Sequence, residues 1–66
     1  MSPSKAIEIN PNEAIYYYNR GWGYKNLGEK QKAKESWSKA AELYKKQGKT
    51  RQYQRTINQI KQLDSD

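Results

Sequence analysis

The chain has 66 residues, with 13 Lys and Arg against 7 Asp and Glu, which gives a formal net charge of +6 and favours acidic partners. It contains neither Cys nor His, which excludes a disulfide framework, a thiolate nucleophile and the commonest general base and metal ligand. No apolar stretch approaches the ~20 residues that span a bilayer, so we expect one small soluble domain with no membrane partner.

The apolar residues are unusual in kind. Six Tyr and two Trp accompany no Phe. Aromatic rings with polar tips must therefore do much of the packing, and such side chains suit half-buried surfaces and interfaces better than a dry core.

The first segment, residues 4–10, has helix-compatible residues. We expect this helix to stop at Asn10, because Pro11 disfavours a helical backbone in the residue before it. Asn12 is then predicted to cap the next helix, with Glu13 in its first turn near the positive end of the helix dipole.

A second helix is predicted over residues 13–27, closed by Gly28. The positions at helical spacing are Ala14, Tyr17, Tyr18, Gly21, Trp22, Tyr24 and Lys25. A glycine inside a helix costs about 1 kcal/mol relative to alanine. Gly21 therefore indicates that another helix approaches its backbone closely.

A third helix is predicted after the turn at 28–30, ending at Gly48. Its apolar stripe consists of Ala33, Trp37, Ala40, Ala41 and Tyr44. Lysines are dense over the turn and this helix, and we interpret them as a solvated outer face. They are Lys30, Lys32, Lys34, Lys39, Lys45, Lys46 and Lys49.

The last segment, from about Thr50 to Leu63, is predicted to be an amphipathic helix with Thr50 as its N-cap. Its apolar side consists of Tyr53, Ile57, Ile60 and Leu63, and its polar side includes Arg51 and Arg55. Residues 64–66 are expected to fray.

Across the second and third helices the spacing resembles the tetratricopeptide repeat, in which large aromatic and small residues alternate. The matching residues, which we expect to pack the hairpin, are Tyr17, Gly21, Tyr24, Ala33, Trp37 and Ala40. The resemblance implies an all-α fold: an antiparallel helical hairpin with a C-terminal solvating helix, as a fragment of a right-handed superhelix. An unrelated three-helix bundle is the alternative.

The resemblance also implies boundaries. Residues 4–12 correspond to the tail of a preceding repeat, 14–47 to one full repeat and 49–64 to a closing helix. The chain departs from the family pattern at three positions, where it carries Arg20, Lys30 and Lys45 in place of the usual Leu, Tyr and Pro. The missing Pro is consistent with a last repeat.

In proteins of this kind the concave face, formed by the first helix of each hairpin, usually holds the partner. By spacing, this face carries Ile15, Tyr18, Asn19, Trp22, Lys25 and Asn26. The alternative is that Tyr18 and Trp22 only pack against the last helix or the N-terminal segment. Asn19 resembles one residue of a clamp that some family members use for carboxylates, but Tyr18 and Trp22 occupy other clamp positions, so we do not expect that activity.

We therefore predict a protein-interaction adaptor or scaffold, without cofactor or metal, in the cytoplasm. One and a half repeats leave aromatic surface uncovered, so homo-oligomers or a domain swap are expected. The alternative is a basic helical module that binds nucleic acid, although no helix-turn-helix or phosphate-loop motif supports it. An enzyme is not expected, because the glutamates lie at helix starts or on polar faces without a buried pair. These are Glu13, Glu29, Glu35 and Glu42.

Overall fold

The computed structural model describes residues 2–65, which form four α-helices and no strand. They are α1 (Pro3–Ile9), α2 (Ala14–Asn26), α3 (Lys30–Lys46) and α4 (Thr50–Ser65). The predicted all-α class is confirmed.

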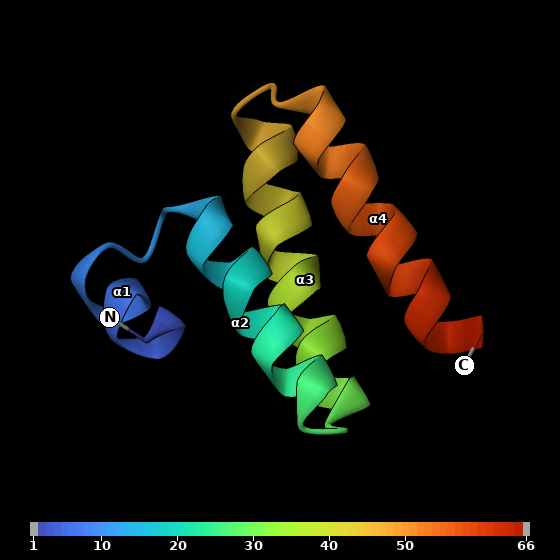
Figure 1. Cartoon of the computed structure of the whole chain (residues 1–66). Helices are drawn as coiled ribbons and strands as arrows, with labels where there is room; N and C mark the ends of the chain where they lie inside the picture. The colour runs from blue at the N-terminus through green and yellow to red at the C-terminus, as the bar shows by residue number, and fades with distance from the viewer. Residues whose placement is uncertain (1, 66) are drawn as a thin grey trace.

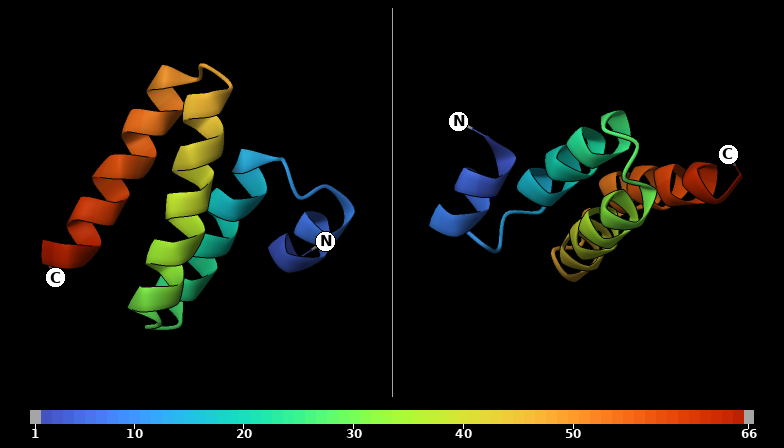
Figure 2. Two further views of the ribbon diagram at one scale, coloured as in Figure 1. Left: turned by 180° about the vertical axis from the view of Figure 1, so that it is seen from behind. Right: turned by 90° about the horizontal axis from the view of Figure 1, so that it is seen from below.

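Successive helices pack against one another, and α1 and the end of α4 lie at opposite edges of the molecule (Figure 1). The α2–α3 hairpin has the most extensive interface, followed by α3 with α4 and then α1 with α2. Viewed from below, α3 lies off the line that joins α2 and α4 (Figure 2). As a result, α2 and α4 together form one side of the molecule.

The turns that end α2 and α3 have the same design. Gly28 has a φ of 79°, and beside it the Glu29 amide donates to the Tyr24 carbonyl at 2.9 Å. Gly48 has a φ of 73°, and the amide of the next residue donates to the Tyr44 carbonyl at 2.9 Å. A positive φ suits glycine because it has no Cβ, which explains why both helices end where the sequence predicted.

Two predicted N-caps are wrong. Glu13, not Asn12, is the N-cap of α2, and its side chain makes no capping hydrogen bond. Asn12 lies instead in the turn after Pro11, where its carbonyl accepts a hydrogen bond from Gln47 Nε2 at 3.3 Å. α2 therefore begins one residue later than predicted, and the turn before it contacts Gln47, the C-cap of α3.

Thr50 is the first helical residue of α4 and not its cap. The turn at Gly48 leads directly into the helix, and the Lys49 carbonyl already accepts from the Tyr53 amide at 2.9 Å. The end of α4 also differs from expectation, because the helix continues to Ser65. Asp66 lies outside the described residues.

An ion pair and a hydrogen bond support the last turn of α4. Asp64 Oδ1 lies 3.4 Å from Lys34 Nζ of α3, and Ser65 Oγ donates to the Lys61 carbonyl at 3.2 Å. These contacts explain why residues expected to fray remain helical.

Candidate protein-binding groove

Close contact between Gly21 and Trp37 fixes α2 on α3. Trp37 is fully buried, and a Cβ added to Gly21 would overlap its indole ring. Trp37 Nε1 also donates a hydrogen bond to the Tyr18 carbonyl at 2.9 Å. The missing side chain at Gly21 therefore makes room for the ring, and the indole N–H is satisfied by the backbone one turn away.

The other residues expected to pack the hairpin lie around this contact. Ala33 and Ala40 are fully buried and Tyr17 is nearly so, whereas Tyr24 is half-buried. The Tyr24 ring has Lys32 Nζ 5.7 Å from its centroid. The small residues thus lie in the interior, and the ring of Tyr24 lies at its border.

Arg20, which stands where the family usually has Leu, is held by three contacts. Its guanidinium lies 5.2 Å from the Tyr17 ring centroid and 5.9 Å from that of Tyr24. Its Nε donates to Oγ of buried Ser36 at 2.9 Å. A cation therefore replaces the aliphatic side chain, and it gains ring faces and a hydrogen bond in exchange.

The aromatic residues of the predicted concave face are partly core. Tyr18 and Trp22 are both half-buried, and their rings meet edge to face at 6.4 Å. Trp22 also lies 5.3 Å from Trp37, in a cluster that Leu63 and Ile60 of α4 join. Both rings thus pack towards α4, as the alternative interpretation held, and each keeps an exposed part.

The remaining residues of that face are more exposed. Ile15 is 43% exposed, and Asn19 and Asn26 are exposed. Lys25 is half-buried and holds its Nζ 5.0 Å from the Trp22 ring centroid. These side chains provide apolar area, amide groups and one cation along α2.

A pocket of about 290 Å³ lies where the start of α2, the end of α3 and the start of α4 meet. Of the six residues predicted for the concave face, it brings together only Ile15 and Tyr18. The other lining residues are Glu13, Ala14, Tyr44, Gln47, Lys49, Gln52, Arg55 and Thr56.

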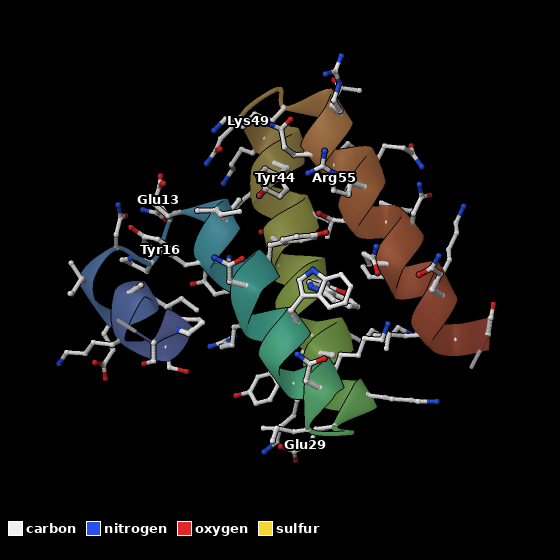
Figure 3. The ribbon with its side chains drawn as sticks, in the orientation of Figure 1. Glu13, Tyr16, Glu29, Tyr44, Lys49 and Arg55 are labelled. Atoms are coloured by element: carbon white, nitrogen blue, oxygen red, sulfur yellow. The ribbon has the colours of Figure 1, made fainter. Side chains whose placement is uncertain are left out.

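Most residues of this pocket had no signal in the sequence. Arg55 was assigned to the polar side of the last helix, and nothing in its spacing placed it opposite Tyr44. Figure 3 shows the two side chains close together between α3 and α4. The spacing within α4 likewise gave no signal for Gln52, which lies one turn before Thr56.

The phenol of Tyr44 is perturbed by its surroundings in the pocket. Burial raises the pKa of Tyr44, the neighbouring Tyr18 and Glu13 raise it further, and the Arg55 cation opposes this. Tyr44 therefore stays a neutral hydroxyl at ordinary pH, able to donate or accept a hydrogen bond at the wall of the pocket.

Charge is unevenly distributed over the described residues. Four lysines, spread over α1 and α3, form ion pairs with carboxylates. These pairs are Lys5–Glu8, Lys32–Glu29, Lys34–Asp64 and Lys39–Glu42. None of the cations around the α3–α4 turn takes part in such a pair within residues 2–65. They are Lys45, Lys46, Lys49, Arg51 and Arg55.

Within residues 2–65, no group of three or more Asp and Glu is placed to hold a metal ion. None of the four helices is long and apolar enough to cross a bilayer.

The sequence profile of the tetratricopeptide repeat matches residues 14–47, more than half of the 66-residue chain. With the helical hairpin that these residues form, this match shows that the chain belongs to the tetratricopeptide repeat family. Repeats of this family are in general protein-interaction modules and are typically non-enzymatic. No match is found among curated proteins or among solved structures.

Proposed function

We propose that the chain binds an extended segment of a partner protein along the side of the molecule shared by α2 and α4. The observation that carries this proposal is the pocket of about 290 Å³ in which Ile15 and Tyr18 of α2 face Gln52 and Arg55 of α4. A partner side chain in this pocket would meet an apolar wall on one side and hydrogen-bond donors on the other. Such mixed surroundings are typical of ligand sites.

The aromatic residues next to the pocket support the proposal. Tyr18 and Trp22 are fixed by their packing on Trp37, so little side-chain entropy would be lost when a partner covers their exposed parts. Large, preorganised rings of this kind are frequent energetic centres of protein interfaces. The exposed amides of Asn19 and Asn26 would be available to the backbone of an extended segment.

A displayed library of random peptides tests this proposal on the intact chain. About ten extended residues match the 31 Å length of the molecule, so peptides of that size suffice. We expect the recovered peptides to lose about tenfold or more in affinity for an Ile15→Asn variant, because Ile15 lines the pocket.

Ile9→Asn is the matched control, because Ile9 is 65% exposed but lies on α1, away from the pocket. The recovered peptides should bind this variant like the wild type. A library that yields no ligand, or ligands that bind both variants equally, would overturn the proposal.

We also propose that the chain self-associates through its N-terminal edge. Leu27 is 74% exposed and borders a hollow of about 170 Å³ between α1 and α2, with Pro3, Gly23 and Tyr24 in its wall. Repeats of this type bury their apolar faces against neighbouring repeats, and usually about three units are needed. A second copy would cover this edge, and sedimentation velocity measures the association.

The cations around the α3–α4 turn support the alternative function, binding of nucleic acid. In that case a single-stranded oligonucleotide should bind at low salt and dissociate steeply as salt is added. No binding at low salt would remove this alternative.

We propose that the protein has no catalytic role, which the lack of His and Cys supports. We also propose a cytoplasmic location, which the lack of Cys supports. Cell fractionation tests the location, and recovery only from an exported fraction would contradict it.

A further inference from the structure

The α3–α4 end of the molecule carries positive charge that forms no ion pair with a carboxylate among residues 2–65. No Asp or Glu occurs between Glu42 and Asp64, and this stretch holds six Lys and Arg. Figure 3 shows Lys49 and Arg55 at the same end of the molecule as Tyr44, with Glu29 at the opposite end. We call the five cations around the turn the cationic end. They are Lys45, Lys46, Lys49, Arg51 and Arg55.

Lys45 and Lys46 lie in the last turn of α3, at the negative end of the helix dipole, but no ion pair neutralises any of the five cations within residues 2–65. The ion pairs of the described residues neutralise lysines of α1, the N-terminal half of α3 and its middle. Within the cationic end, Lys45 holds its Nζ 5.8 Å from the Tyr53 ring, and the other four have no ion-pair partner among residues 2–65. The screening length at physiological salt is about 8 Å, so neighbouring cations of this group act together on an anion that lies between them.

The cationic end continues into the pocket. Lys49 and Arg55 line it opposite Ile15 and Tyr18, and Glu13 is its one carboxylate. We infer that the partner segment is acidic: it places an apolar side chain against Ile15 and Tyr18, and its carboxylates lie over the cationic end. This inference rests on the proposed function, because it names the chemistry of the segment that the pocket receives.

An acidic protein segment fits this surface better than a nucleic acid. Proteins that bind single strands stack bases on exposed aromatic rings. At the cationic end Tyr44 is buried, and Tyr53 is half-buried with Lys45 near its ring. Carboxylates, in contrast, bind to cations without an exposed aromatic ring. The chain also belongs to a family of protein-interaction modules.

Fluorescence anisotropy with two labelled synthetic peptides tests the inference. Both are about ten residues long and carry the same central leucines, and the glutamates of the first are glutamines in the second. We expect the wild type to bind the glutamate peptide about tenfold more tightly than the glutamine peptide, and added salt to reduce the difference.

A charge-matched pair of variants locates the effect. Lys49→Gln/Arg55→Gln removes two cations at the pocket, and Lys30→Gln/Lys32→Gln removes two at the opposite end of α3. The first variant should lose the preference for glutamate and the second should keep it, with circular dichroism confirming that both are helical. If both variants lose the preference equally, net charge alone explains the binding and the inference is overturned.

The other outcomes distinguish failure of the acidic preference from failure of the proposed function. Equal binding of the two peptides to the wild type overturns the acidic preference but leaves groove binding intact. Binding of neither peptide also overturns the preference, and the function itself fails only if the random library gives no ligand either. A thymidine oligonucleotide that binds more tightly than the glutamate peptide, and is lost in the Lys49→Gln/Arg55→Gln variant, would assign the cationic end to nucleic acid.

Discussion

At the scale of single residues, the two glycines of α2 differ in the space around them, so their substitution should have opposite effects on stability. A Cβ at Gly21 would overlap the indole of Trp37, whereas a Cβ at Gly23 would meet nothing within 4 Å. Gly21→Ala should therefore lower the free energy of unfolding by about 1–3 kcal/mol through overpacking, although alanine is the better helix former. Urea denaturation followed by circular dichroism measures this change.

Gly23→Ala is the matched control in the same helix. It should raise the free energy of unfolding by about 0.5–1 kcal/mol, because alanine loses less backbone entropy and nothing obstructs its methyl group. If Gly21→Ala also stabilised the protein, the close contact between α2 and Trp37 would be wrong.

Tyr44 gives the stability a dependence on alkaline pH. Burial, Tyr18 and Glu13 raise the pKa of Tyr44 in the folded state, so the folded protein holds the phenolic proton more tightly than the unfolded chain does. This contribution is fully present below pH 10, the ordinary pKa, and is lost as the pH rises through the folded pKa. Tyr44→Phe should therefore show a smaller loss of stability between pH 9 and 11 than the wild type.

Arg55→Gln should have the opposite effect to Tyr44→Phe and enlarge the loss of stability at alkaline pH. Since the Arg55 cation lowers the pKa of Tyr44, its removal should raise that pKa further and extend the loss of stability to higher pH. Absorbance of the phenolate, compared between this variant and the wild type, measures the shift. No shift would show that Arg55 does not face Tyr44.

At the scale of the elements, α4 depends on a few residues for its docking on α3. Leu63 is 5% exposed and packs with Ala33 and Trp37. Leu63→Ala should lower the free energy of unfolding by about 2–4 kcal/mol, while Lys61→Ala on the exposed side of α4 should change it by about 0.5 kcal/mol or less. Thermal denaturation compares the two. Similar effects would mean that α4 is not docked as described.

The helices and most of their ends could be predicted from the sequence. Helical spacing and the glycines at 28 and 48 were enough to find all four helices and the ends of α2 and α3. The N-cap of α2 was predicted wrongly, and the contact that Gln47 makes with the Asn12 carbonyl is tertiary and has no local signal. The match to the repeat family covers residues 14–47, which include the small and large residues that pack the hairpin.

The pocket could not be predicted, for a geometric reason. Its lining comes from three helices and depends on how α4 crosses the hairpin, which the spacing within α4 does not specify. Arg55 and Gln52 therefore read as ordinary polar residues until α4 is placed beside Tyr18 and Tyr44. Ile15 and Tyr18 were found because the position of α2 in the repeat indicates its concave face.

At the scale of the whole molecule, we expect association driven by the N-terminal edge. The sedimentation coefficient of the wild type should rise with concentration in the micromolar range. Leu27→Asn should weaken this rise, because it places a polar group in the uncovered apolar hollow. A folded wild-type protein that stays monomeric throughout would contradict self-association.

The most direct test of the proposed binding site between α2 and α4 uses the two tryptophans as reporters in one nitrogen–proton correlation spectrum. The Trp37 indole N–H is buried and bonded to the Tyr18 carbonyl, while Trp22 lies beside it with an exposed part. On titration with a peptide recovered from the library, we predict large shifts of the Trp22 indole signal and of the Ile15 and Gln52 amides, with little change at Trp37. Shifts confined to α1 or to the outer face of α3, with the Trp22 signal unmoved, would contradict a binding site between α2 and α4.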